Sequence, residues 1–252
     1  MILEIIYQDE NMIVINKPAG ISVHGGETIR GDTLVDFLLK KFPEIKDVGD
    51  LPYETKSGSL KQDTTYRPGI VHRLDKDTSG VMVVARNQKS FEILKKIFKE
   101  RLIEKKYIAL LCGKLKNKSG IIEEAIGRLV KNPFKRGVAD KKTAIRGARS
   151  ALTEYKVKKE YNEYSLVEFT PKTGRMHQIR VHAKALGHPI ACDKIYGGKK
   201  GCCPEGLNRM FLHAKSLSFS LDDGKRFMFE ADLSEDLENV LKKQAIVKIS
   251  DS

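Results

Sequence analysis

Five ionisable side chains crowd into six positions ahead of an apolar run at residues 81–85: His72, Arg73, Asp75, Lys76 and Asp77. Asp75 lies between Arg73 and Lys76, and neighbouring positive charge favours the ionised form of a carboxylate. An ionised carboxylate is suited to nucleophilic attack or to stabilising a cation, and it is a poor proton donor. Taken alone, such a stretch is more often a salt-bridged surface turn.

The elements that must position this turn follow from hydrophobic patterning. Apolar runs and alternation predict strands at residues 2–7, 12–15, 81–85, 107–111, 152–161, 164–170, 211–221 and 227–229. Helical spacing and N-cap residues predict helices after Thr33, Asn87 and Ser234, and over 177–186. Residues 43–69 are polar and are expected to form a long loop. Because strands and helices do not alternate regularly, the predicted class is α+β, with a mixed, mainly antiparallel sheet and flanking helices.

The composition favours a polyanionic partner. The 252 residues suit one large domain or two small ones, and 46 Lys and Arg against 33 Asp and Glu give a formal net charge of +13. Such a balance indicates nucleic acid first and a membrane surface second. No apolar stretch approaches the roughly 20 residues of a membrane span, and the N-terminal residues do not resemble a signal peptide. We therefore expect a cytoplasmic protein with no membrane partner.

The four cysteines are Cys112, Cys192, Cys202 and Cys203, and none of them forms a C-x-x-C pair. Their spacing supports neither a zinc site nor a disulfide framework. Reduced thiols are therefore expected.

Residues 131–150 form the most basic segment and contain a single acid, Asp140. The cations are Lys131, Lys135, Arg136, Lys141, Lys142, Arg146 and Arg149. One interpretation is a solvated loop. We favour a loop or hairpin that grips phosphates, because such charge density repels itself unless a polyanion neutralises it.

The stretch around Asp75 resembles the catalytic motif of RluA-type pseudouridine synthases, and the match runs through all of H-R-L-D-K-D-T-S-G. Other motifs of that family occur in the family's order: N-K-P-A-G at 16–20, V-H-G-G at 23–26, K-K-Y-I-A-L at 105–110, T-G-R-M-H-Q-I-R-V-H at 173–182, A-L-G-H-P-I at 185–190 and N-R-M-F-L-H-A at 208–214. The resemblance covers nearly the whole chain. Met176 departs from the usual Thr, and Cys192 stands where Gly is common.

The resemblance implies an isomerase that breaks the N-glycosidic bond of a uridine in RNA and rejoins uracil C5 to ribose C1′. It implies no cofactor and no metal. By motif position Asp75 is the carboxylate at C1′, where positive charge builds as the bond breaks. Tyr107 is the tyrosine that stacks on uracil or helps to remove the C5 proton, and Arg180 is the cation paired with Asp75. Whether Asp75 attacks C1′, attacks the base or deprotonates the sugar stays open at this point.

Further substrate contacts are implied by the same resemblance. Arg73 fills the space that a flipped uridine leaves, and Leu212 helps to wall the uracil pocket. Arg175 contacts RNA phosphate or the local fold, and His72 supports the site. The expected unit is a single catalytic domain over 1–252 with a central active-site cleft and no N-terminal RNA-binding appendage.

RNA is the expected partner, with large-subunit ribosomal RNA preferred and transfer RNA as the alternative, and a monomer is expected. Two other function classes stay open on the residues. A glycosylase that releases the base to water would use the same carboxylate with help from Asp77. A non-catalytic RNA-binding or ribosome-assembly protein would need the basic segment but not Asp75, Tyr107 and Arg180 together.

Overall fold

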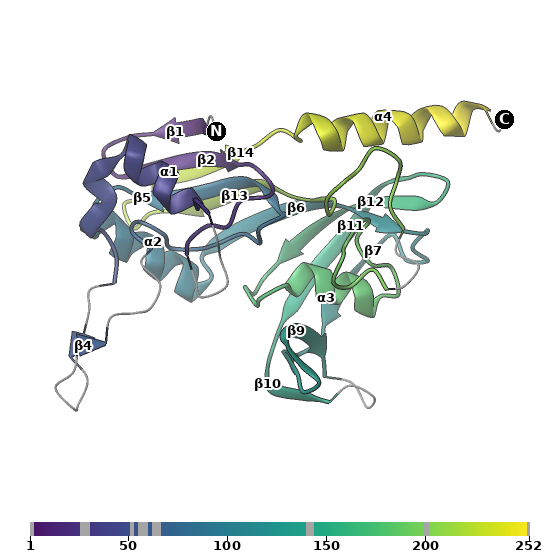
Figure 1. The fold of residues 1–252 in the computed structure, drawn as a ribbon, viewed down its shortest axis with the longest axis horizontal. Helices are drawn as coiled ribbons and strands as arrows, with labels where there is room; N and C mark the ends of the chain where they lie inside the picture. Colours follow the sequence, from purple (N-terminus) through teal and green to yellow (C-terminus); the bar gives the residue numbers. More distant parts are fainter. Residues whose placement is uncertain are drawn as a thin grey trace. The chain divides into compact units, whose positions relative to one another are not determined.

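The computed structural model describes residues 3–25, 31–50, 53–54, 60–61, 67–139, 144–198 and 202–250 (Figure 1). The span predicted as one domain packs as two compact units. The first unit is Met1–Ile103 with Phe219–Ala231, and the second is Glu104–Ser218 with Asp232–Ser252. Each unit has its own strands and helices. No helix in the described part of the chain is both long and apolar enough to cross a membrane.

Three strands build the sheet of the first unit in the order β1 (Glu4–Gln8), β2 (Met12–Lys17) and β5 (Ser79–Ala85). Both pairings are antiparallel. All seven residues of β5 are buried, as the apolar run predicts. β14 (Arg226–Glu230) returns beside the last residues of β13 (Leu212–Ser220) and adds Phe227 and Phe229 to an aromatic cluster with Tyr7.

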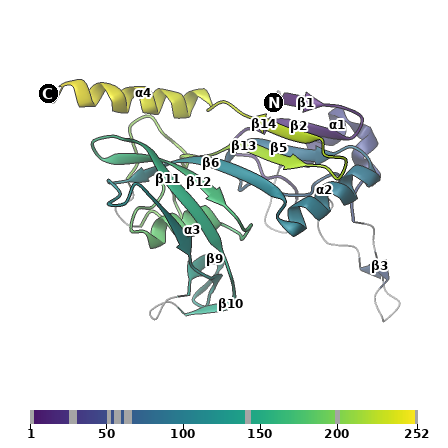
Figure 2. The same cartoon turned by 180° about the vertical axis from the view of Figure 1, so that it is seen from behind.

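The helices of the first unit can be followed in Figure 2. Two of them begin at the predicted caps. α2 (Gln88–Glu100) is capped by the Asn87 side chain, which accepts a hydrogen bond from the Ser90 amide, and it packs against β5. α1 (Leu34–Lys41) begins at Thr33, whose backbone N–H and hydroxyl both donate to Asp36. A side chain that pairs with the first-turn amides or the cap in this way stabilises a helix start.

The segment predicted as a long loop, residues 43–69, contains short elements. Pro43–Asp47 forms a 3₁₀ helix (η1), because proline suits a first helical position and Ile45 is fully buried. Tyr53–Glu54 (β3) pairs with Leu60–Lys61 (β4). The rest of 51–66 lies outside the described residues.

The second unit holds a larger sheet in the order β13-β6-β12-β11-β7. The strands that have not yet been given bounds are β6 (Ile103–Cys112), β7 (Ser119–Glu123), β11 (Leu152–Glu160) and β12 (Tyr164–Pro171). Its described registers are antiparallel, in agreement with the predicted class. Helices α3 (Gln178–Ala185) and α4 (Glu235–Ser250) supply apolar residues to the core of this unit, among them Ile179 and Leu237.

The predicted basic loop or hairpin is a separate three-stranded antiparallel sheet in the second unit. Its order is β10 (Ile145–Arg149), β8 (Ile126–Leu129) and β9 (Asn132–Val138). The strand β9 lies beside α3 (Figure 1). This sheet presents most of the cations that the sequence singles out.

Candidate active site

Asp75 sits on a turn that leads directly into β5. The Thr78 N–H donates to the Asp75 carbonyl at 3.1 Å and closes the turn one residue before the strand begins. Leu74 points inward and is 6% exposed, whereas Arg73 is exposed and Asp75 is partly buried. The alternation gives the turn an apolar anchor and leaves the flanking guanidinium and carboxylate accessible.

Lys17 holds this turn from within the first unit. Its side chain is 0% exposed, and its ammonium donates to the carbonyl oxygens of Pro18 at 2.8 Å, Lys76 at 3.1 Å and Thr78 at 2.9 Å. A buried ammonium is costly unless hydrogen bonds satisfy it, so these carbonyls fix the turn around the charge. Lys17 belongs to the N-K-P-A-G motif, but a lysine at the end of an apolar strand does not by itself indicate this role.

His72 is a structural member of the same turn. Its Nε2 accepts a hydrogen bond from the Val83 N–H at 3.0 Å, and its ring stacks on Phe98 with centroids 4.3 Å apart. These contacts tie the start of the motif to β5 and α2. The predicted substrate contact of His72 stays a prediction.

Gly69, three residues before the motif, cannot be replaced without strain. It adopts φ +70°, and a Cβ there would lie 2.6 Å from the Ala85 carbonyl oxygen and 2.9 Å from Val84 Cγ1. Only glycine allows the chain to pass this close to β5.

Tyr107 and Leu212 belong to the second unit. Tyr107 is partly buried on β6, opposite Phe169 of β12, and packs against the core of that unit. Leu212 is 4% exposed and is a member of that core. Their predicted uracil contacts stay predictions.

Arg180 forms a buried bidentate ion pair with Asp193. The Nε donates to Oδ2 and the Nη2 donates to Oδ1, both at 2.8 Å, and the Asp193 side chain is fully buried. The backbone N–H groups of Ile195 and Tyr196 also donate to Oδ1, at 2.9 and 3.0 Å. Burial opposes ionisation of Asp193, but the Arg180 bonds, the Arg180 charge and these amides outweigh it and hold its pKa below the ordinary value.

The T-G-R-M-H-Q-I-R-V-H block is organised by a buried polar network. The Thr173 hydroxyl and the Arg175 N–H both donate to Gln178 Oε1, at 2.7 and 2.9 Å. The Gln178 amide donates to the Thr153 hydroxyl at 2.9 Å, and that hydroxyl lies 2.8 Å from His182 Nδ1. Burial lowers the pKa of His182, although a bond to the Glu124 carbonyl opposes this. The motif therefore positions the helix that carries Arg180.

Tyr196 links that helix to the basic sheet. Its hydroxyl accepts from the Arg136 N–H at 3.0 Å and lies 2.8 Å from His177 Nδ1. The Arg180 guanidinium lies over its ring, 5.1 Å from the centroid. Motif position alone gave Tyr196 no role.

The predicted RNA-binding cations lie in several surroundings. Lys131 is exposed just before β9, and Lys135 donates to the Ile195 carbonyl at 3.3 Å. Arg136 Nη2 lies 3.0 Å from Met176 Sδ. Arg175 donates through Nε to the Ser150 carbonyl at 3.0 Å, a contact that supports the local fold. Lys141 and Lys142 fall outside the described residues.

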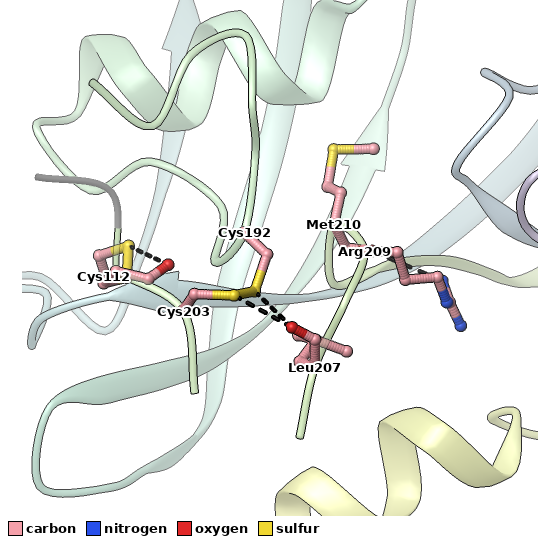
Figure 3. The surroundings of a disulfide bond; sticks show 7 residues. Cys112, Cys192, Cys203, Leu207, Arg209 and Met210 are labelled. Carbon is pink, nitrogen blue, oxygen red and sulfur yellow. Dashed lines mark hydrogen bonds between the residues drawn. A yellow bond between two sulfur atoms is a disulfide. The ribbon is translucent and has the colours of Figure 1, made fainter. Parts of the chain in front are cut away.

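The prediction of reduced thiols is wrong for this structure. Cys112 is bonded to Cys202 and Cys192 to Cys203, with Cα atoms 5.9 and 4.6 Å apart (Figure 3). The Leu207 carbonyl oxygen lies 3.5 Å from Cys192 Sγ and 3.2 Å from Cys203 Sγ. The pairing depends on contacts that spacing does not reveal: the Cys112 N–H donates to the Pro189 carbonyl and the Cys192 N–H to the Cys202 carbonyl.

The candidate residues divide between the two units. His72, Arg73 and Asp75 lie in the first unit, and Tyr107, Arg180 and Leu212 lie in the second. Within each unit the motifs are brought together by direct contacts. The pairing of Asp75 with Tyr107 and Arg180 stays a prediction.

Comparison with known proteins identifies relatives over most of the chain. Residues 11–185 match the family model described as RNA pseudouridylate synthase. The chain is 39% identical over 234 residues to the ribosomal large subunit pseudouridine synthase D of Borreliella burgdorferi, covering 92% of this chain and 65% of that protein. It is 36% identical over 250 residues to the protein of the same name from Neisseria meningitidis serogroup B, covering 96% of this chain and 61% of that protein. The chain thus spans less than two thirds of the length of either relative.

Two solved human structures share the fold. The first is human RNA pseudouridylate synthase domain containing 1, which has a TM-score of 0.74 and 27% identity and covers 95% of this chain and 87% of that chain. The second is human RNA pseudouridylate synthase domain containing 4, which has a TM-score of 0.72 and 26% identity and covers 96% of this chain and 93% of that chain. These likenesses agree with the predicted α+β class.

Proposed function

This chain belongs to the RNA pseudouridylate synthase family, and on that premise we propose that it converts specific uridines in structured RNA to pseudouridine. The bond between ribose C1′ and uracil N1 breaks, the uracil turns, and C5 bonds to C1′ as its proton is lost to N1 overall. Atoms and electrons balance within the substrate. The reaction changes neither the mass nor the oxidation state of the RNA.

Asp75 supplies negative charge at the anomeric carbon, where positive charge develops as the glycosidic bond weakens. The turn that carries it is closed by Thr78 and held by the buried Lys17 ammonium. Because the backbone is fixed before substrate binds, little reorganisation is needed when the carboxylate meets the ribose. A base within a helix cannot reach such a group, so in this proposal the uridine is flipped out and Arg73 fills its space. The exposure of Arg73 on the same turn supports this role.

Tyr107 and Arg180 complete the proposed chemistry. The Tyr107 ring stacks on the uracil, and its phenol assists removal of the C5 proton. Arg180 is the cation that pairs with Asp75 in this proposal, while Asp193 and Tyr196 orient its guanidinium. This assignment makes Asp193 a positioning residue.

We propose large-subunit ribosomal RNA as the substrate class. The names of the relatives from Borreliella burgdorferi and Neisseria meningitidis support this choice. The basic sheet β8-β9-β10 would bind the phosphates around the target, and its exposed cations include Arg128, Lys131 and Arg146. A specific RNA loop or bulge would supply the sequence selectivity.

The observation that carries the proposal is the match of residues 11–185 to the family model, with the complete motif on an anchored turn at Asp75. The test compares wild type with Asp75→Asn, which removes the charge and keeps the shape. Carbodiimide mapping of modified uridines would be performed on total RNA from a deletion strain that carries either form. The control is Asp222→Asn, which changes an exposed carboxylate in the β13–β14 turn.

We expect wild type and Asp222→Asn to restore the same large-subunit sites and Asp75→Asn to restore none. Sites restored only in transfer RNA would replace the proposed substrate class. Equal restoration by Asp75→Asn, or release of free uracil with an abasic product, would sink the proposed reaction.

A further inference from the structure

Phe134 presents an aromatic ring to solvent from the basic sheet. Its side chain is 78% exposed, more than any other large hydrophobic side chain in the described part of the chain. Single exposed apolar residues are common and need no explanation by themselves. The surroundings of Phe134 distinguish it from the others.

The ring is presented by an ordered strand. The Phe134 N–H donates to Asn132 Oδ1 at 3.2 Å, which shapes the start of β9. Two residues further on, the Arg136 N–H donates to the Tyr196 hydroxyl at 3.0 Å, and Lys135 donates to the Ile195 carbonyl at 3.3 Å. The strand is therefore tied to the 195–196 segment, and Phe134 is offered from a supported backbone.

A row of arginines crosses the same sheet. Arg128 of β8 is paired directly with Arg136 of β9 on one side and with Arg146 of β10 on the other. Side chains directly opposite each other in antiparallel strands share a face, and like charges there repel. The described residues 126–139 and 144–149 contain no Asp or Glu. No carboxylate within these stretches opposes the row, and an RNA phosphate backbone has the charge to do so.

An exposed aromatic ring two residues from one arginine of this row matches a nucleotide with an unpaired base. Phe134 and Arg136 lie two residues apart on β9, at a register shift in its pairing with β8, so at most about 7 Å of backbone separates them. One nucleotide can therefore place its phosphate near Arg136 and its base near Phe134. Duplex RNA keeps its bases stacked inside and offers phosphates alone, whereas loops and bulges offer a free base for aromatic stacking. We propose that Phe134 stacks on an unpaired base of the RNA while the arginine row binds the adjacent phosphates.

This inference rests on the proposed function for the identity of the polyanion, and it adds a base-binding site that lies outside the uridine-modifying motif. The first experiment measures the Kd of the full chain for a stem–loop RNA and for a blunt duplex of the same length. Stacking contributes about 1–3 kcal/mol per base, so Phe134→Ala should raise the Kd for the stem–loop about 5- to 150-fold. The same variant should leave the Kd for the duplex unchanged.

Matched variants separate stacking from mere apolarity and from charge. Phe134→Tyr should bind as wild type, and Phe134→Leu should bind as weakly as Phe134→Ala. Ile121 lies on β7 opposite Glu154 of β11, and its side chain is 65% exposed. Ile121→Ala should leave the Kd for the stem–loop unchanged. Arg128→Gln should lower the slope of log Kd against log salt by about 0.7 per lost contact to single-stranded RNA, and Phe134→Ala should keep the wild-type slope.

Fluorescence gives a direct readout, because the chain has no tryptophan. In Phe134→Trp the single indole should be quenched by the stem–loop RNA and not by the duplex or by inorganic polyphosphate. Ile121→Trp should be quenched by none of them. The inference is overturned if the fluorescence of Phe134→Trp is not quenched by the stem–loop RNA, or if polyphosphate quenches it equally.

The two proposals fail separately. If wild type forms pseudouridine but Phe134→Trp is not quenched by its substrate RNA, the stacking site is refuted and the proposed function stands. If the indole is quenched by looped RNA while no RNA gains pseudouridine, the stacking site stands and the proposed function is refuted.

Discussion

Arg180 and Asp193 lock together in the second unit through two hydrogen bonds of 2.8 Å with the aspartate fully buried. The family resemblance implies a role for Arg180 and none for Asp193. Because a buried guanidinium must be satisfied, its orientation depends on this partner. The pair therefore affects both the stability of the second unit and the orientation of Arg180 in the proposed reaction.

Asp193→Ala should lower the free energy of unfolding by about 3–5 kcal/mol, because it leaves the Arg180 charge buried without its partner. Urea unfolding monitored by circular dichroism measures the loss. The control is Asp232→Ala, whose side chain is 96% exposed and pairs with Lys215 at the surface. That change should cost less than about 1 kcal/mol. Equal losses in the two variants would contradict the importance of burial.

Lys17→Met should disturb the turn that carries Asp75. The substitution leaves the carbonyls of Pro18 and Thr78 without this donor, while the Lys76 carbonyl keeps the Gly20 N–H. The bond to Thr78 is buried and the bond to Pro18 is partly buried. Because an unsatisfied buried group costs about 1–3 kcal/mol, a loss of at least about 1 kcal/mol is expected.

The Lys17 variant also has a functional signature. If Lys17 positions Asp75, turnover should fall while the Kd for RNA stays at the wild-type value. Lys89→Met changes an exposed lysine on α2, outside the motif, so it should preserve both turnover and stability. A Lys17→Met protein with wild-type turnover would remove the positioning role.

His182 should make stability depend on pH. Burial lowers its pKa below 6.5, so the unfolded chain binds this proton more readily than the folded one. The contribution of the neutral His182 side chain to the free energy of unfolding is therefore complete above pH 6.5. It is lost as the pH falls from 6.5 through the lowered pKa of the folded state. His182→Gln should flatten the decline in unfolding free energy between pH 7.5 and the acid side of this window. An unchanged pH profile in the variant would count against a buried neutral imidazole.

Reduction of the two disulfides should destabilise the chain by about 2–4 kcal/mol, since each bond restricts the unfolded ensemble. Thiol titration of the unfolded protein should detect no free cysteine before reduction and four after it. Cys112→Ser combined with Cys202→Ser should reproduce part of the loss. Four titratable thiols in protein purified without reductant would contradict both bonds.

Local signals predicted much of the fold. Asn87 and Thr33 begin their helices as their side-chain chemistry indicates, and the apolar run of β5 is fully buried. β9 was harder to predict, because its sequence contains Pro133 and Gly137 and alternates poorly. It becomes a strand through pairing with β8 and through the bond to Tyr196, which are tertiary effects.

The candidate site was predictable only as far as motif residues carry their own chemistry. A carboxylate between cations alone indicates a surface turn, and Asp75 could be selected only because the whole of H-R-L-D-K-D-T-S-G resembles the motif of a known family. Lys17 and Asp193 are both buried and act through distant partners. Lys17 contacts Lys76 and Thr78, 59 and 61 positions away, and Asp193 contacts Arg180, 13 positions away. Such pairings are set by the packed chain, so no spacing rule reveals them.

The two disulfide bonds also determine whether the fragments separate after proteolytic cleavage of the backbone. Lys194 is exposed and lies between Cys192 and Cys202, so trypsin cleavage there puts Cys112 and Cys192 on one fragment and Cys202 and Cys203 on the other. Both cross-links then bridge the break. A nicked molecule would migrate as one band on a non-reducing gel and separate into two only after dithiothreitol is added.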